Sequence, residues 1–381
     1  ADVLRQHQLA MVGDLPCIQR AIRSLHFPAD DQDLVNARSR FVFQELLVMQ
    51  LALALRRRKI TAEMLSPPLP VNAMIDARIT NRFPFELTAD QKSAIAEIGS
   101  DMARQFPMNR LLQGDVGSGK TVVAIYAMLL AVANGYQSVM MAPTEVLARQ
   151  HFKTLHQLLI DSRVRVGLLC GSMSSVERRD VINATEAGEI EILVGTHALL
   201  HDSVQFNQLG LCVIDEQHKF GVSQRDSLRS GGIDPHYLVM SATPIPRSVA
   251  MTVFGDVELS TLRDQPPGRG KVSTYLAQDG WKDRWWEFVR ERLREGRQAY
   301  VVAPKVSRDA SRDEDAEDVT SVESVFEELC NGAFSDFRVG LLHGRMPNET
   351  KQGIMDDFAS GKLQVLVSTT VVAVSYTHLT L

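Results

Sequence analysis

The stretch from Gly114 to Thr121 fits the phosphate-loop pattern G-x-x-x-x-G-K-[ST]. Its glycines let the backbone curl so that successive N–H groups point at a phosphate. Lys120 offers a point charge for β- and γ-phosphates, and the Thr121 hydroxyl is a ligand for Mg²⁺. A chance glycine-rich turn is the alternative, but an apolar strand pattern precedes the loop and a helix pattern follows it. We therefore predict nucleotide binding through Gly114, Asp115, Val116, Gly117, Ser118, Gly119, Lys120 and Thr121.

Two adjacent carboxylates, Asp215 and Glu216, end the apolar run 211–214. An aspartate there can hold Mg²⁺, and a glutamate can orient and deprotonate the water that attacks a γ-phosphate. Acidic pairs are common at strand ends, but one placed about a hundred residues after a phosphate loop is a strong indicator. His218 is either structural or close to the γ-phosphate, and its adjacency to Glu216 favours the second reading. The predicted catalytic residues are Lys120, Asp215, Glu216 and His218, and the predicted metal ligands are Thr121 and Asp215.

Phe85 and Gln91 lie upstream of the loop. An aromatic ring can stack on adenine, and a glutamine amide can read its N6 and N7 edge. Equally, Thr88 and Gln91 fit a helix capping box. On the local pattern alone, these two interpretations stand level.

The segment Ser-Ala-Thr-Pro-Ile-Pro-Arg at 241–247 follows another apolar run. Two prolines stiffen it, and short hydroxyls face the expected phosphate site. It suits a coupling element between the nucleotide and a second ligand. Taken alone, it is more simply an ordinary proline-stiffened loop.

Length and composition bound the class of protein. The 381 residues suffice for two or three domains, and 45% hydrophobic and 23% charged residues are ordinary for a globular chain. Four scattered cysteines without Cys-x-x-Cys spacing argue against zinc and fit a reducing cytoplasm. No apolar run reaches membrane-spanning length, so no membrane partner is expected. The net charge of −5 neither indicates nor excludes nucleic acid, and a start at Ala1 suggests a fragment.

Residues 1–80 are expected to be helical. A start signal at 28–31 precedes apolar residues at near-helical spacing up to Leu55, and the predicted helix ends in the basic run 56–59. That run suits either DNA phosphates or a solvated helix C-terminus, and the second is the simpler. The prolines within 67–70 then mark a linker.

Residues 81–265 alternate short apolar runs with helix-length segments, which predicts an α/β fold with a parallel sheet. A proline- and glycine-rich hinge at 265–271 leads into a second α/β unit, residues 266–381. The carboxyl ends of such strands carry ligands, and the residues with chemistry fall there. The expected strands are 110–113, 138–142, 192–195, 211–215 and 237–241, then 299–303, 338–342 and 364–368, with a helix over 348–360.

Together these motifs resemble superfamily-2 helicases, and among them the RecG-type DNA helicases of bacteria. The resemblance covers about residues 22–372 and implies tandem RecA-like domains over 81–265 and 266–381, the second incomplete, behind a helical linker segment over 1–80. It implies ATP and Mg²⁺ as cofactors and turns Phe85 and Gln91 into expected adenine contacts. The matching segments are F-E-L-T-x-x-Q at 85–91, Q-G-D-V-G-S-G-K-T at 113–121, A-P-T-E-V-L-A at 142–148, G-T-H-A-L at 195–199, D-E-Q-H at 215–218, F-G-V at 220–222 and S-A-T-P-I-P-R at 241–247.

The same resemblance implies contacts with DNA. Because these are contacts with the phosphate backbone, we expect little base specificity and a salt-dependent affinity. The implied DNA-binding residues are Thr144, Arg149, Gly171, Ser172, Thr196, His197, His343, Gly344, Arg345 and Thr369. The implied coupling residues are Gln217, Ser241, Thr243 and Arg247.

The implied function is an ATP-dependent DNA helicase or translocase that remodels branched DNA and stalled replication forks in recombination and repair. The expected partner is branched or forked DNA, with single-stranded-DNA-binding protein as a further candidate. A monomer at the bacterial nucleoid, in the cytoplasm, is expected. Two alternatives stay open: a double-stranded DNA translocase of the transcription-repair coupling type, and a non-hydrolysing nucleotide-gated DNA-binding module.

The sequence departs from the family pattern after Val372. Residues 373–381 do not continue with the family's Glu-Val-Gly-Val-Asp-like motif, and the Gln-x-x-Gly-Arg-x-Gly-Arg motif that carries its arginine finger is absent. A missing arginine finger costs about 10³–10⁵ in rate in comparable enzymes. We therefore expect the fragment to bind nucleotide and to turn it over weakly.

Overall fold

The computed structural model describes eight stretches of the chain, and the structural statements below concern these alone. They are residues 15–196, 199, 204–215, 233–242, 257–264, 273–278, 280–303 and 322–369. Among them, no helix combines the length and apolarity needed to cross a membrane.

The centre of the fold is a parallel sheet of seven strands in the order β3-β4-β2-β5-β6-β1-β7. All seven residues of β5 are buried, as expected for a strand covered on both faces. In register, Asp215 pairs with Met240 and Gln113 pairs with Ser241, so β5, β6 and β1 end at one edge. The strands are β1 (Asn109–Gly114), β2 (Gln137–Met141), β3 (Val166–Leu169), β4 (Ile192–Gly195), β5 (Leu209–Asp215), β6 (His236–Ser241) and β7 (Glu258–Leu262).

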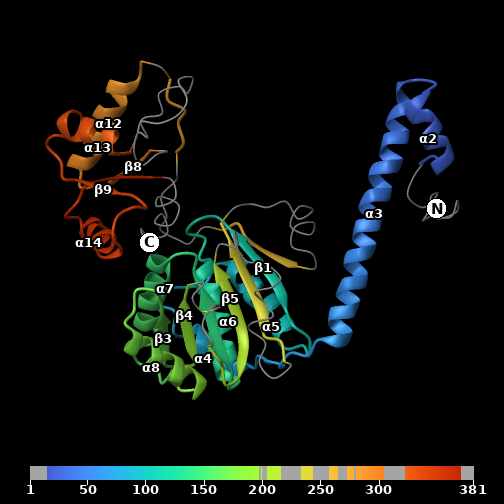
Figure 1. Ribbon diagram of the computed structural model, residues 1–381, viewed down its shortest axis with the longest axis horizontal. Helices are drawn as coiled ribbons and strands as arrows, with labels where there is room; N and C mark the ends of the chain where they lie inside the picture. Colours follow the sequence, from blue (N-terminus) through green and yellow to red (C-terminus); the bar gives the residue numbers. More distant parts are fainter. Residues whose placement is uncertain are drawn as a thin grey trace.

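Helices cover this sheet (Figure 1). The most buried is α6, whose side chains from Val123 to Ala131 are almost wholly removed from solvent within the larger core. A second apolar cluster contains the strand residues that alternate along the chain with those of the larger core, among them Val139, Cys212 and Val239. The helices are α4 (Ala73–Thr80), α5 (Ala89–Met102), α6 (Lys120–Ala133), α7 (Glu145–Leu158) and α8 (Ser175–Glu186).

A second parallel sheet has three strands in the order β8-β10-β9. Its core places Phe334 against Trp286 with ring centroids 5.2 Å apart, together with Val365 and Val367 of the central strand. The strands are β8 (Ala299–Ala303), β9 (Val339–Leu342) and β10 (Val365–Thr369). The helices are α12 (Lys282–Arg294), α13 (Val322–Asn331) and α14 (Asn348–Ala359).

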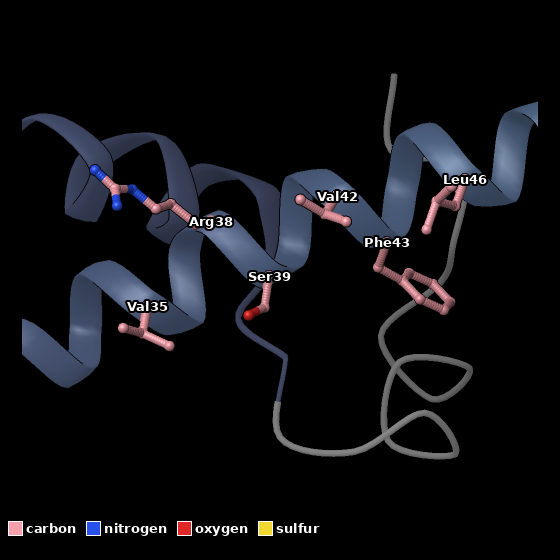
Figure 2. A pocket seen from close by; sticks show the side chains of 6 residues that line it. All are labelled: Val35, Arg38, Ser39, Val42, Phe43 and Leu46. Carbon is pink, nitrogen blue, oxygen red and sulfur yellow. The ribbon is translucent and has the colours of Figure 1, made fainter. Parts of the chain in front are cut away.

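Two helices precede the first sheet: α2 (Ile18–His26) and α3 (Asp31–Glu63). With 33 residues, α3 is about 50 Å long. Figure 1 shows it leading away from the sheet. A shallow apolar hollow lies on one of its faces, lined by Val35, Arg38, Ser39, Val42, Phe43 and Leu46 (Figure 2).

The segment that follows α3 is tied to the first sheet by hydrogen bonds. The backbone N–H groups of Ser66 and Leu69 donate to carbonyl oxygens at and just after the end of α5 (2.9 and 2.7 Å). The buried imidazole of His236, at the start of β6, donates from Nε2 to the carbonyl oxygen of Pro67 (2.8 Å). Its Nδ1 accepts the N–H of Met108 (3.0 Å). The predicted proline-rich linker is therefore held against the end of α5 and the start of β6.

The α/β fold with two parallel sheets behind a helical segment is confirmed, and the predicted strands lie within two residues of the observed ones. The predicted end of the long helix at residue 59 is wrong, because α3 continues to Glu63. Two strands were not predicted. β3 (Val-Gly-Leu-Leu) is apolar but only four residues long, and β7 mixes polar with apolar residues (Glu-Leu-Ser-Thr-Leu), which weakens the pattern of a buried strand.

Candidate functional site

The phosphate loop joins β1 to α6 through two glycines in the left-handed region: Gly117 at φ 80° and Gly119 at φ 86°. A Cβ on Gly119 would also lie 2.2 Å from Nε2 of Gln91, so a larger residue would displace that amide, while the positive φ itself favours glycine. The loop wraps the end of the Lys120 side chain, whose Nζ donates to the carbonyl oxygens of Gly114 (2.8 Å) and Asp115 (2.9 Å). The ammonium group is thus held at the centre of the loop, where phosphate oxygens bind in such loops.

A cavity of about 690 Å³ opens beside this loop. Its size lies within the range of about 300–1,000 Å³ that is usual for small-molecule sites. It brings together three predicted groups: the phosphate loop, Phe85 with Gln91, and Asp215. The lining residues are Phe85, Glu86, Gln91, Gly117, Gly119, Lys120, Thr121, Val122, Gln150, His151, Thr154, Asp215 and Met240.

The carboxylate of Asp215 lies at the end of β5 and is almost fully buried. The Nε2 atom of His151, on α7, is 2.8 Å from its Oδ2 atom. Within the part of the chain that the structure describes, no group of three or more His, Cys, Asp or Glu residues could hold a metal on its own. Mg²⁺ is commonly bound by one or two protein oxygens together with substrate phosphates and water. Thr121 and Asp215, which line one cavity with the phosphate loop, fit that mode.

Gln91 forms the capping box at the start of α5. Its Oε1 accepts the N–H of Thr88 (3.0 Å), and the Thr88 hydroxyl accepts the N–H of Gln91 (3.3 Å). Its Nε2 also donates to the carbonyl oxygen of Ser118 in the phosphate loop (2.9 Å). Of the two interpretations left level by the sequence, the cap is therefore present, and the amide is engaged by the protein. The adenine contact stays a prediction.

Phe85 lines the same cavity with half of its surface exposed. Its ring stacks on Phe83, with centroids 6.0 Å apart and planes at 25°. This arrangement presents one aromatic face to a flat ligand and fits the predicted adenine stack.

The described residues of the predicted DNA interface on the first sheet follow three neighbouring strands, β2, β4 and β3. Thr144 caps α7 by accepting the N–H of Leu147 (3.4 Å). Arg149 donates from Nη2 to Oε1 of Glu145 and to the hydroxyl of Ser172, both at 2.9 Å. Gly171 and Thr196 stand at the same strand ends. The fold thus gathers these predicted contacts at one edge of the sheet, and their role stays a prediction.

In the second sheet, the predicted residues again follow adjacent strands. His343, Gly344 and Arg345 come directly after β9, and Thr369 ends β10. His343 is almost fully buried, with Nε2 3.9 Å from Oε1 of Glu323. The carbonyl oxygen of Gly344 accepts a hydrogen bond from Nζ of Lys351 (2.8 Å), which closes the turn onto α14.

Of the predicted coupling residues, Ser241 is described: it ends β6, is buried, and pairs in register with Gln113. Other predicted site residues lie outside the described residues, and their roles stay predictions. Those outside are His197, Glu216, Gln217, His218, Thr243 and Arg247.

Three polar residues of α7 line the cavity and were not predicted: Gln150, His151 and Thr154. A signal for them existed. They recur at i, i+1 and i+4 in a helix that directly follows the Ala-Pro-Thr segment at a strand end, which places a polar stripe beside the predicted ligand edge.

Comparisons with known proteins agree with this architecture. The family model described as DEAD/DEAH box helicase matches residues 88–252, and the helicase conserved C-terminal domain matches residues 286–378. The ATP-dependent DNA helicase RecG of Mycobacterium tuberculosis (strain H37Rv) is 41% identical over 376 residues, which cover 93% of this chain and 51% of the relative. RecG of Bacillus subtilis (strain 168) is 41% identical over 360 residues, covering 94% and 52%.

A solved structure of RecG bound to a three-way DNA junction superposes with a TM-score of 0.77 at 36% identity, covering 97% of this chain and 48% of that one. The chain spans about half the length of the curated relatives it matches. The two family models, the sequence identities and the superposition all point to the same family. The chain therefore belongs to the RecG family of superfamily-2 DNA helicases.

Proposed function

We propose that this chain is the motor part of an ATP-dependent DNA helicase that remodels branched DNA and stalled replication forks in recombination and repair. The observation that carries the proposal is the cavity in which the phosphate loop meets Asp215, Thr121 and Phe85. The similarity to RecG supports the DNA substrate, since a relative was solved on a three-way junction.

Each half of the nucleotide has residues suited to it. Lys120, held at the centre of the loop, neutralises β- and γ-phosphate charge, and the loop N–H groups bind phosphate oxygens. The exposed face of Phe85 takes the adenine ring, with Gln91 beside it at the loop. Thr121 and Asp215 would hold Mg²⁺, which when bound neutralises charge on the phosphates. Glu216 accepts a proton from the attacking water, and His218 lies next to it in sequence.

The DNA backbone is proposed to bind at the carboxyl edge of the sheets. Arg149, Ser172 and Thr144 provide donors there, together with Gly171, Thr196 and His197, and the second sheet adds His343, Gly344, Arg345 and Thr369. Gln217, Ser241, Thr243 and Arg247 are proposed to relay the nucleotide state to these contacts. Phosphate contacts of this kind give affinity that falls with salt and carry little sequence preference.

The proposed organisation is a helical segment over 1–80 and two RecA-like domains over 81–265 and 266–381. A monomer in the bacterial cytoplasm, at the nucleoid, is proposed, with single-stranded-DNA-binding protein as a candidate partner. Weak ATP turnover by the 381-residue chain stays a prediction.

Binding experiments test the proposal. A fluorescent ATP analogue should bind the chain in the presence of Mg²⁺, and Lys120→Ala should weaken binding by at least about tenfold through loss of a charge-assisted contact. A labelled three-way junction should bind more tightly than linear duplex of equal length. Absence of nucleotide binding, or equal affinity for both DNA shapes, would overturn the corresponding half of the proposal.

A further inference from the structure

The side chain of His151, on α7, reaches Asp215 at the end of β5. Its Nε2 atom lies 2.8 Å from Oδ2 of Asp215, and both residues are about nine-tenths buried. A carboxylate accepts hydrogen bonds only, so Nε2 carries the proton in this contact. Both residues line the cavity beside the phosphate loop.

The packing of α7 does not require a histidine at this position. The helix is anchored by its N-cap Thr144 and by Leu147, Ala148 and Leu155, whose side chains are almost wholly buried in the core. What the histidine adds is a hydrogen-bond donor for the buried Asp215 carboxylate, which an apolar side chain could not supply. The contact constrains rotation of the Asp215 carboxylate, because a hydrogen bond from a rigid ring fixes one of its two oxygens.

Resting on the proposed function, we infer that His151 is a positioning residue that holds the Asp215 carboxylate in the orientation that binds Mg²⁺. It acts through Asp215. Residues that orient a metal-binding carboxylate in this way typically affect metal affinity by about 10–100-fold.

The geometry of α7 keeps the side chain of His151 apart from the predicted DNA contacts. Residues two apart on a helix lie about 200° apart around its axis, so His151 faces the cavity while Arg149 faces Glu145 and Ser172 on the opposite side. The positioning residue is therefore set by the buried face of α7, away from the predicted DNA contacts.

The test is a Mg²⁺ titration of the binding of a fluorescent ATP analogue to the 381-residue chain. His151→Ala should raise the free Mg²⁺ needed for half-maximal binding by about tenfold or more. In EDTA, His151→Ala should weaken nucleotide binding by less than it does in Mg²⁺, because the proposed role of His151 acts through the metal-binding carboxylate. His151→Gln places an amide N–H near the position of Nε2 and should restore the Mg²⁺ midpoint, whereas the shorter His151→Asn should not.

His156→Ala is the matched control, because His156 is on the same helix but its ring lies against Phe152, tilted by 40°, outside the cavity. It should leave the Mg²⁺ midpoint unchanged. If the original chain fails to bind the analogue, the proposed nucleotide site falls and the inference falls with it. If the original chain shows Mg²⁺-dependent binding and neither His151→Ala nor His151→Asn moves the midpoint, only the positioning role is overturned. Should His151→Ala not fold, failure of a folded His151→Asn to shift the midpoint decides against the inference.

Discussion

Nε2 of His236 donates a hydrogen bond to the carbonyl oxygen of Pro67 across 2.8 Å, in a position where the imidazole has no exposed surface. The ring is neutral there, because Nδ1 accepts the N–H of Met108. Burial is the largest cause that lowers the pKa of His236, from 6.5 to about 4.

This pair makes stability depend on pH. The unfolded chain takes up a proton on His236 near pH 6.5, and the folded chain only near pH 4, so the contribution is complete above pH 6.5 and is lost as the pH falls to 4. The free energy of unfolding should fall by about 3 kcal/mol across this window from His236 alone. Urea unfolding at a series of pH values measures the slope. His236→Gln should flatten it relative to the original chain, and identical slopes would remove His236 as the cause.

Gly119→Ala should abolish nucleotide binding. Alanine costs about 1–2 kcal/mol in the left-handed region, and here its Cβ would also collide with the Gln91 amide that braces the loop. Gly135→Ala is a matched control, since Gly135 has φ 83° and nothing within 4 Å of a new Cβ. Both variants should lose similar backbone stability in thermal melts, but only Gly119→Ala should fail to bind a fluorescent nucleotide. Unimpaired binding by that variant would contradict the assigned loop.

Arg110 is a buried charge whose removal should be costly. It donates to Asp101 from Nη2 (2.6 Å), to Glu97 (2.8 Å) and to the Ser260 hydroxyl (2.7 Å). Arg110→Met leaves buried acceptors without their partner and should destabilise the chain by about 3–5 kcal/mol. In urea unfolding, the double variant with Asp101→Leu should recover part of this loss. Strictly additive losses would show that the two side chains do not interact.

Arg165 forms an exposed ion pair, which can be compared with the buried pair of Arg110. Its ion pair with Glu189 (3.1 Å) joins two side chains that are each more than half exposed. Arg165→Ala should therefore change stability by less than about 1 kcal/mol.

Arg149→Ala should weaken DNA binding uniformly across sequences and reduce the dependence of log affinity on log salt by about one unit, as expected for one lost phosphate contact. Fluorescence anisotropy with a labelled junction at several salt concentrations measures both quantities. Arg165→Ala again serves as the control, because Arg165 precedes β3 and lies at the amino edge of the sheet, opposite Arg149. A loss of affinity confined to one DNA sequence would contradict a backbone contact.

The sequence was sufficient wherever chemistry and fold share a local pattern. The loop at 114–121 is set by its own glycines, and the strand ending at Asp215 is a continuous apolar run, so both the elements and their neighbours along the chain could be predicted. In the sheet, β5 and β1 flank β6, and their carboxyl ends lie at one edge, as a parallel α/β pattern implies.

Contacts between distant residues could not be predicted in the same way. His151 and Asp215 are separated by 64 positions, and nothing local to either indicates the other. Gln91 fits a capping box and an adenine contact equally from its neighbours, and only the fold shows that its second amide group reaches Ser118. The strand β7 escapes a hydrophobic pattern because it is an edge strand, where polar residues are tolerated.

The hydrogen bonds along the segment after α3 have a mechanical consequence. Only a few residues beyond the end of α3 at Glu63, Ser66 and Leu69 bond to the end of α5 and Pro67 bonds to β6. The segment after α3 must therefore move together with the first sheet. The helix that leads into it is about 50 Å long. If α3 keeps its angle to this segment, a rotation of the sheet by about 10° would move the far end of the helix by about 9 Å.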